Sequence, residues 1–60
     1  MYVLRFVRKD RQPPEEYYYN QLEDAMYHLS LFVDDDSGLY EKIELVDYDT
    51  NKPLHILKYS

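Results

Sequence analysis

The chain has 60 residues, of which 45% are hydrophobic and 17% aromatic, and it carries a formal net charge of −5 at pH 7. Such a chain is too apolar for a disordered segment and too short for more than one domain. It has no Cys, which excludes disulfides and cysteine-based zinc sites, and no apolar run approaches the roughly 18 residues of a membrane span.

The first predicted element is a strand over residues 2–8, a segment rich in β-branched and aromatic side chains. Alternation places Leu4 and Phe6 on one face of this strand. It places Val3 on the other face, beside the charged Arg5.

Three consecutive tyrosines in residues 15–19 favour a second strand after a polar loop that ends in two prolines. The alternative is a helix start, since Pro followed by two Glu also suits a first helical turn. Asn20 is a preferred N-cap and Glu23 stands three residues later, as in a capping box. A helix that begins after Asn20 leaves the tyrosines in the strand, and we adopt that interpretation.

A helix is predicted from about residue 21 to residue 33, because apolar side chains recur there at spacings of three and four. The apolar stripe consists of Leu22, Ala25, Met26, Leu29, Phe32 and Val33. The helix should end near three consecutive aspartates, since negative charge is unfavourable at a helix C-terminus. Gly38, the only glycine, suits a turn with positive φ.

Residues 40–48 and 54–59 predict two further strands, rich in β-branched and aromatic side chains. Residues 49–52 between them have a turn composition, and Asn51 is suited to a left-handed backbone conformation.

The predicted fold is α+β: a single two-layer ββαββ domain over residues 1–60, with a four-stranded, mostly antiparallel sheet and one helix packed on one face. The residues expected toward the helix are Leu4, Phe6, Ile43, Leu45 and Ile56. The residues expected on the outer face are Val3, Val7, Tyr18, Val46, Tyr48, Leu57 and Tyr59. A one-residue change of register exchanges the two sets in any strand.

Three groups of residues are candidate partner-binding sites. A sheet face that mixes tyrosine, aliphatic and charged side chains is typical of an interface. Its members are Tyr18, Val46, Tyr48, Leu57 and Tyr59. Tyr27 and Leu31 lie four residues apart, opposite the helical stripe, where they can anchor a partner or simply stabilise the helix. The third group, Asp34, Asp35 and Asp36, is either a solvated helix exit or a patch for a basic partner.

Metal binding and catalysis find little support. Asp47, Asp49 and Asn51 match the first ligand positions of a calcium loop, but lysines replace its glycine and its bidentate glutamate. His28 and His55 are far apart in the sequence, and there is no Cys nucleophile. We predict no enzymatic activity, no catalytic residue, no metal and no cofactor.

Charge is divided unevenly along the chain: residues 1–11 carry a net +3 and residues 12–60 a net −8. The acidic part repels nucleic-acid phosphates and favours a partner with a basic surface. The basic cluster at the start consists of Arg5, Arg8, Lys9 and Arg11.

These features predict a small acidic, cytoplasmic protein-interaction module that regulates or inhibits a partner protein by covering its surface. Self-association as a homodimer is a further expectation, because so small a core gains from it. One alternative is an acidic mimic of nucleic acid that blocks a basic groove; in size and charge only, the chain resembles small phage-type inhibitors of nucleases. A second alternative is a weak single-stranded nucleic-acid binder through the basic cluster. No membrane association is expected.

Overall fold

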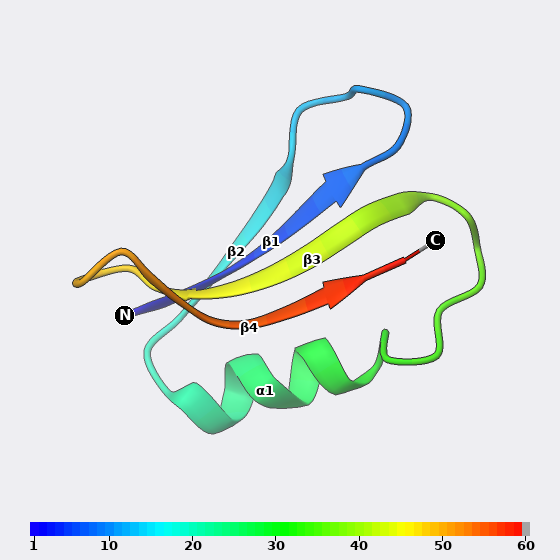
Figure 1. Ribbon diagram of the computed structural model, residues 1–60. Coiled ribbons are helices and arrows are strands. Elements are labelled where there is room, and N and C mark those ends of the chain that lie inside the picture. Colours follow the sequence, from blue (N-terminus) through cyan, green and yellow to red (C-terminus); the bar gives the residue numbers. More distant parts are fainter. Residues whose placement is uncertain (60) are drawn as a thin grey trace.

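The computed structural model describes residues 1–59 and has two layers, a sheet and a helix (Figure 1). The elements are β1 (Tyr2–Arg8), β2 (Glu15–Tyr19), α1 (Leu22–Ser30), β3 (Tyr40–Asp47) and β4 (Lys52–Lys58). The strands form one sheet in the order β2-β1-β3-β4, and all neighbours are antiparallel. The predicted ββαββ fold is therefore confirmed, including the strand that contains the three tyrosines.

The two hairpins place β1 beside β3, so that the first strand of the chain is central in the sheet. Leu4 of β1 lies opposite Tyr17 of β2 and also opposite Leu45 of β3. The turns use the residues that the sequence indicated, since Gly38 has φ 76° and Asn51 has φ 57°. Both values lie in the left-handed region, which glycine and asparagine enter at low cost.

The α-helix is shorter than the predicted 21–33. Its N-cap is Gln21, and the structure shows no side-chain capping bond there, so the predicted capping box at Asn20 is wrong. At the other end, the N–H groups of Phe32 and Val33 bond to carbonyls three residues back, at 3.0 and 3.4 Å. These tighter bonds make a 3₁₀-like turn that ends the α-helix at Ser30.

The core lies between α1 and the two central strands. Its buried cluster consists of Leu4, Phe6, Ala25, Leu29, Ile43 and Leu45. The Phe6 ring is at its centre and meets the rings of Tyr17, Phe32 and Tyr40 edge-on, with centroids 5.5, 4.9 and 5.3 Å away. Aromatic edges thus surround the one aromatic side chain of an otherwise aliphatic cluster.

The two faces of β4 are exchanged relative to the prediction. Ile56 was expected toward the helix, but it lies opposite Glu44 on the outer face and is 42% exposed. Leu57 lies opposite Ile43 and packs against the core, as Tyr59 does. A change of register opposite Leu45 and Val46 accompanies this pairing. Alternation within a strand does not fix the register between strands, and a shift of one residue moves every side chain to the other face.

Replacing Leu29 by Ala should lower the free energy of unfolding by about 2–5 kcal/mol, because it opens a cavity in the core. A domain of this size has about 3–5 kcal/mol in total, so the variant should be largely unfolded. Leu31, which is 61% exposed, supplies the control: Leu31→Ala should change the free energy by less than about 0.5 kcal/mol. Urea denaturation followed by circular dichroism measures both, and equal effects would contradict this core.

Candidate protein-interaction surface

The sheet face opposite α1 contains two valines that are buried although the only described helix lies on the other side. Val3 is 0% exposed and Val46 is 5% exposed. They are register partners in β1 and β3, and Tyr18 of β2 lies opposite Val3 on its other side. The cover over these valines must come from side chains of the sheet face itself.

Tyr18 and Tyr48 supply that cover. Their rings meet edge-on with centroids 5.7 Å apart. Tyr18 lies in β2, while Tyr48 directly follows β3 and bonds through its N–H to the Met1 carbonyl at 2.9 Å. Because β1 lies between β2 and β3, the contact between the two rings crosses β1. Tyr18 and Tyr48 remain 51% and 55% exposed, so they offer aromatic surface to solvent on the same face as the buried valines. We call these two residues the tyrosine pair.

A network of ion pairs runs across the same face. Arg5 Nε lies 2.7 Å from Glu16 Oε2, and Arg5 also pairs with Glu44 at 4.0 Å. Lys42 Nζ lies 3.0 Å from the same Glu44 carboxylate. Two cations and two carboxylates therefore balance one another across three strands. We call these four residues the ion-pair network.

The network also reaches the tyrosine pair. The Tyr18 hydroxyl donates to Glu16 Oε1 at 3.3 Å. Desolvation, followed by the nearby charge of Glu16, raises the pKa of Tyr18, while the bond to Glu16 raises the pKa of Arg5. Tyr18 thus stays a neutral hydrogen-bonding group whose hydroxyl is held by Glu16.

The structure brings together only part of the first predicted site. Tyr18, Val46 and Tyr48 share the outer face, with Val46 as buried support. Leu57 and Tyr59 lie on the helix side, where the Tyr59 hydroxyl donates to the Phe32 carbonyl at 2.5 Å. Their assignment to the outer face was wrong, for the register reason given above.

Sequence reasoning placed Val3 on the outer face but missed that it is buried there, and it missed Ile56 as an exposed member of that face. The alternation of β4 fits either register, so the sequence holds no signal for Ile56. The burial of Val3 does have a sequence signal, because pairing the first two strands as a hairpin places Tyr18 opposite Val3.

The other two predicted sites belong to α1 and the segment after it. Tyr27 and Leu31 are 69% and 61% exposed, as the helical spacing predicted. The three aspartates follow the end of the helix, and Asp35 accepts a bond from the Ser37 hydroxyl at 2.7 Å. Both groups lie away from the tyrosine pair, which is on the other face of the sheet.

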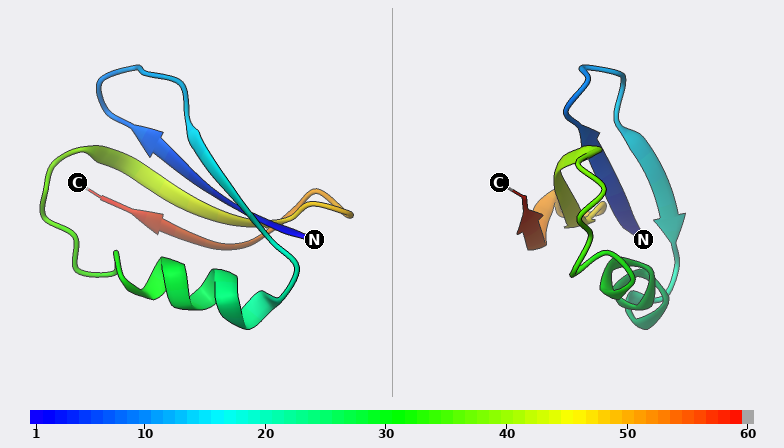
Figure 2. Two further views of the ribbon diagram at one scale, coloured as in Figure 1. Left: turned by 180° about the vertical axis from the view of Figure 1, so that it is seen from behind. Right: turned by 90° about the vertical axis from the view of Figure 1, so that its right-hand side faces the viewer.

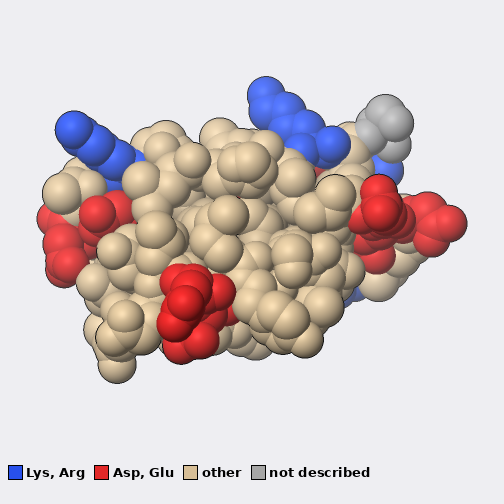
Figure 3. All heavy atoms as spheres, turned by 90° about the horizontal axis from the view of Figure 1, so that it is seen from below, with Lys and Arg blue, Asp and Glu red and all other residues tan. Residues whose placement is uncertain are grey.

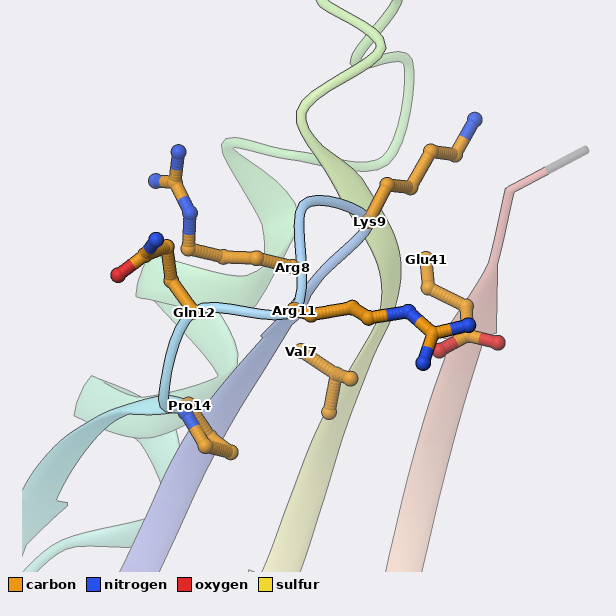
Figure 4. A pocket seen from close by; sticks show the side chains of 7 residues that line it. All are labelled: Val7, Arg8, Lys9, Arg11, Gln12, Pro14 and Glu41. Atoms are coloured by element: carbon orange, nitrogen blue, oxygen red, sulfur yellow. The ribbon is translucent and has the colours of Figure 1, made fainter.

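The basic residues near the N-terminus do not converge on a ligand site. Arg8 bonds to Asp10 at 2.8 Å and pairs with Glu15 at 3.3 Å; the bond lowers the pKa of Asp10 to about 2. Arg8, Lys9 and Arg11 border a pocket of about 600 Å³, yet Figure 4 shows their side chains pointing in different directions. Such an arrangement gives little support to binding of single-stranded nucleic acid.

Within residues 1–59, no group of three or more His, Asp or Glu side chains is placed to hold a metal ion. None of the helices among those residues has the length and apolar character needed to cross a membrane. No protein-family model, curated protein or solved structure matches this chain.

His28 is the one histidine that the fold encloses. Its Nδ1 lies 2.5 Å from the Tyr19 hydroxyl, and its ring lies against Phe6 and Tyr17 with centroids 5.4 and 5.0 Å away. Burial lowers the pKa of His28 below its ordinary value of 6.5. This side chain joins α1 to β2 as a neutral group, which is a structural role.

Stability should therefore fall as the pH drops below about 6.5. Above that pH His28 is neutral in the folded and in the unfolded chain. Below it the unfolded chain binds a proton at His28 while the folded chain does not, which favours unfolding. This effect grows until the pH reaches the lower pKa that His28 has in the folded chain. His28→Gln should remove this slope, and His55→Gln, at an exposed position, should keep it. Urea denaturation between about pH 7.5 and pH 5 measures the slope. An unchanged slope in His28→Gln would rule out this origin.

Proposed function

We propose that the protein is a small, non-enzymatic protein-interaction module that covers a surface of its partner protein with the outer face of its sheet. The observation that carries the proposal is the tyrosine pair, half-exposed over two buried valines. Tyrosine offers a large contact area at low cost in conformational entropy, and fixed aromatic side chains are frequent anchors of interfaces.

The ion-pair network suits the border of such an interface. Its carboxylates and cations already pair with one another, so a partner does not have to neutralise a buried charge on binding. The exposed Ile56 adds an aliphatic contact on the same face. The face therefore combines apolar anchors with a balanced polar surround, as protein interfaces do.

The excess negative charge favours a basic partner. Residues 12–60 carry a net −8, and Asp34, Asp35 and Asp36 contribute three of these charges. Such a charge accelerates encounter with a basic protein more than it tightens the final complex. A regulator or inhibitor that has to find its target quickly gains from this effect.

The nucleic-acid mimic is the less supported alternative. A mimic of a phosphate backbone needs carboxylates along a continuous track. Figure 3 shows the molecule from the α1 side, with acidic groups gathered at the two ends and at one edge and with uncharged surface between them. On the outer face, two of the carboxylates are already paired with Arg5 and Lys42.

A second copy of the chain is one partner that fits the outer face. Its charges balance within each copy, so two copies can meet there without strong repulsion. A stable interface buries about 800 Å² on each side. That is about a fifth of the molecular surface of 4376 Å², or roughly one face of so small a sheet.

Replacing Tyr18 and Tyr48 together by Ser should abolish partner binding, because it removes both anchors and opens the valines to water. Tyr27→Ser, on the exposed side of α1, is the matched control and should retain binding. The tagged variants are compared by capture of bound protein and by sedimentation velocity, with circular dichroism to confirm folding. A folded double variant that still captures the same partner and sediments as the parent does would refute the role of the pair.

A further inference from the structure

The helix layer is incomplete, and the uncovered part lies above β4. Strands in a sheet stand about 4.8 Å apart and a helix with its side chains is about 10 Å wide, so one helix covers two or three strands. In the described part of the chain, the backbone of α1 comes within 8 Å of β2, β1 and β3 but not of β4. Figure 2 shows β4 extending past the helix at the edge of the sheet.

The flank of α1 that faces this gap is apolar. Ala25 and Leu29 point into the core, and His28 points toward β2, where it meets Tyr19. At 100° per residue, Leu22 and Met26 lie on the opposite flank, toward β4. They are 41% and 43% exposed, so two neighbouring large apolar side chains are partly open to solvent on this flank.

The gap has an apolar second wall. Leu57 of β4 turns its half-buried side chain to the helix side, and His55 lies next to it opposite Leu45. Val33, just beyond α1, is 54% exposed. The α1–β4 surface, as we name it, consists of Leu22, Met26, Val33, His55 and Leu57. In Figure 3 the centre of this side of the molecule is free of Lys, Arg, Asp and Glu.

We propose that the α1–β4 surface binds one amphipathic helix of a partner protein, whose apolar stripe packs on Met26 and Leu57 and whose ends carry Lys or Arg. A helix fits because α1 is centred on β1, and β4 lies two strand spacings, about 9.6 Å, from β1. A further helix centred on β4 would therefore pack beside α1 at the usual 8–10 Å between axes. The bound helix completes the second layer that the sheet lacks. This site lies on the opposite face from the tyrosine pair and stands independently of it.

The acidic residues near the two ends of the α1–β4 surface favour a partner helix whose ends are basic. Glu23 lies in the first turn of α1, about 60° around the helix from Met26, and three aspartates follow the last turn. At that second end, a pocket of about 290 Å³ is lined by Asp35, Asp36, Tyr40, Tyr59, Lys9 and Gly38. Two carboxylates exceed the one ammonium there, and two tyrosine rings border the space. A Lys or Arg side chain can bind there by charge and by cation–π contact.

The same features disfavour other occupants. A second copy of α1 would bring its own Glu23 and aspartates against those of the first. An added strand along the β4 edge would meet Lys52, Pro53 and Lys58, and lysine and proline are typical of edges that resist pairing. A basic amphipathic helix meets neither obstacle.

The probe is a synthetic amphipathic peptide of about 18 residues with a leucine stripe flanked by Lys. Its control replaces every Lys by Glu. Labelled peptide is titrated with the protein by fluorescence anisotropy, and amide shifts map the contact. The Lys peptide should bind, with shifts at Leu22, Met26, Val33 and Leu57, and the Glu peptide should not bind.

Met26→Glu should weaken binding of the Lys peptide about ten-fold or more, since it places a charge in the apolar contact. Tyr27→Glu adds the same charge on the adjacent, solvent-facing side of α1 and should not weaken binding. No binding of the Lys peptide, shifts confined to the outer face, or equal affinity of the two Glu variants would overturn the proposal. The first and third outcomes do not bear on the tyrosine pair, which is tested by its own variants, whereas shifts confined to the outer face would assign the peptide to that pair.

Discussion

Four strands need more apolar cover than the nine-residue helix α1 supplies, and the rest of the structure follows from this shortage. The helix is placed over β1 and its two neighbours, where Phe6 gathers three aromatic rings around itself. Beyond that centre, the apolar side chains of each strand are either covered by other side chains of the sheet or exposed to solvent. The two proposed binding surfaces are the places where this cover ends.

Tyrosine offsets the shortage on both faces, because its ring packs and its hydroxyl stays hydrogen-bonded. Tyr19 and Tyr59 tie the helix layer to the two edges of the sheet, through His28 and through the Phe32 carbonyl. Tyr18 and Tyr48 cover the outer valines without a helix. Most of the tyrosines thus serve stability directly, and the outer pair combines stability with an exposed aromatic surface.

Local patterns predicted the elements because alternation, helical spacing and turn residues act within a few positions. The strand nature of Tyr17, the helix around Leu29 and the turn at Asn51 are of this kind. The faces of Leu57 and Ile56 depend instead on pairing with β3, which no pattern inside β4 reveals. The candidate site was predicted in part for the same reason: Tyr18 and Tyr48 were found, while the burial of Val3 beneath them needs knowledge of strand order.

Native-state hydrogen exchange of the free protein tests most directly whether the layer above β4 is incomplete. The amides that join β1 to β3 lie beneath the helix and should exchange only through global unfolding. The amides that join β4 to β3 have no helix above them, so they should exchange much faster through a local opening that leaves the centre intact. Equal protection of the two ladders would show that β4 is held as firmly as the core, and would contradict this account.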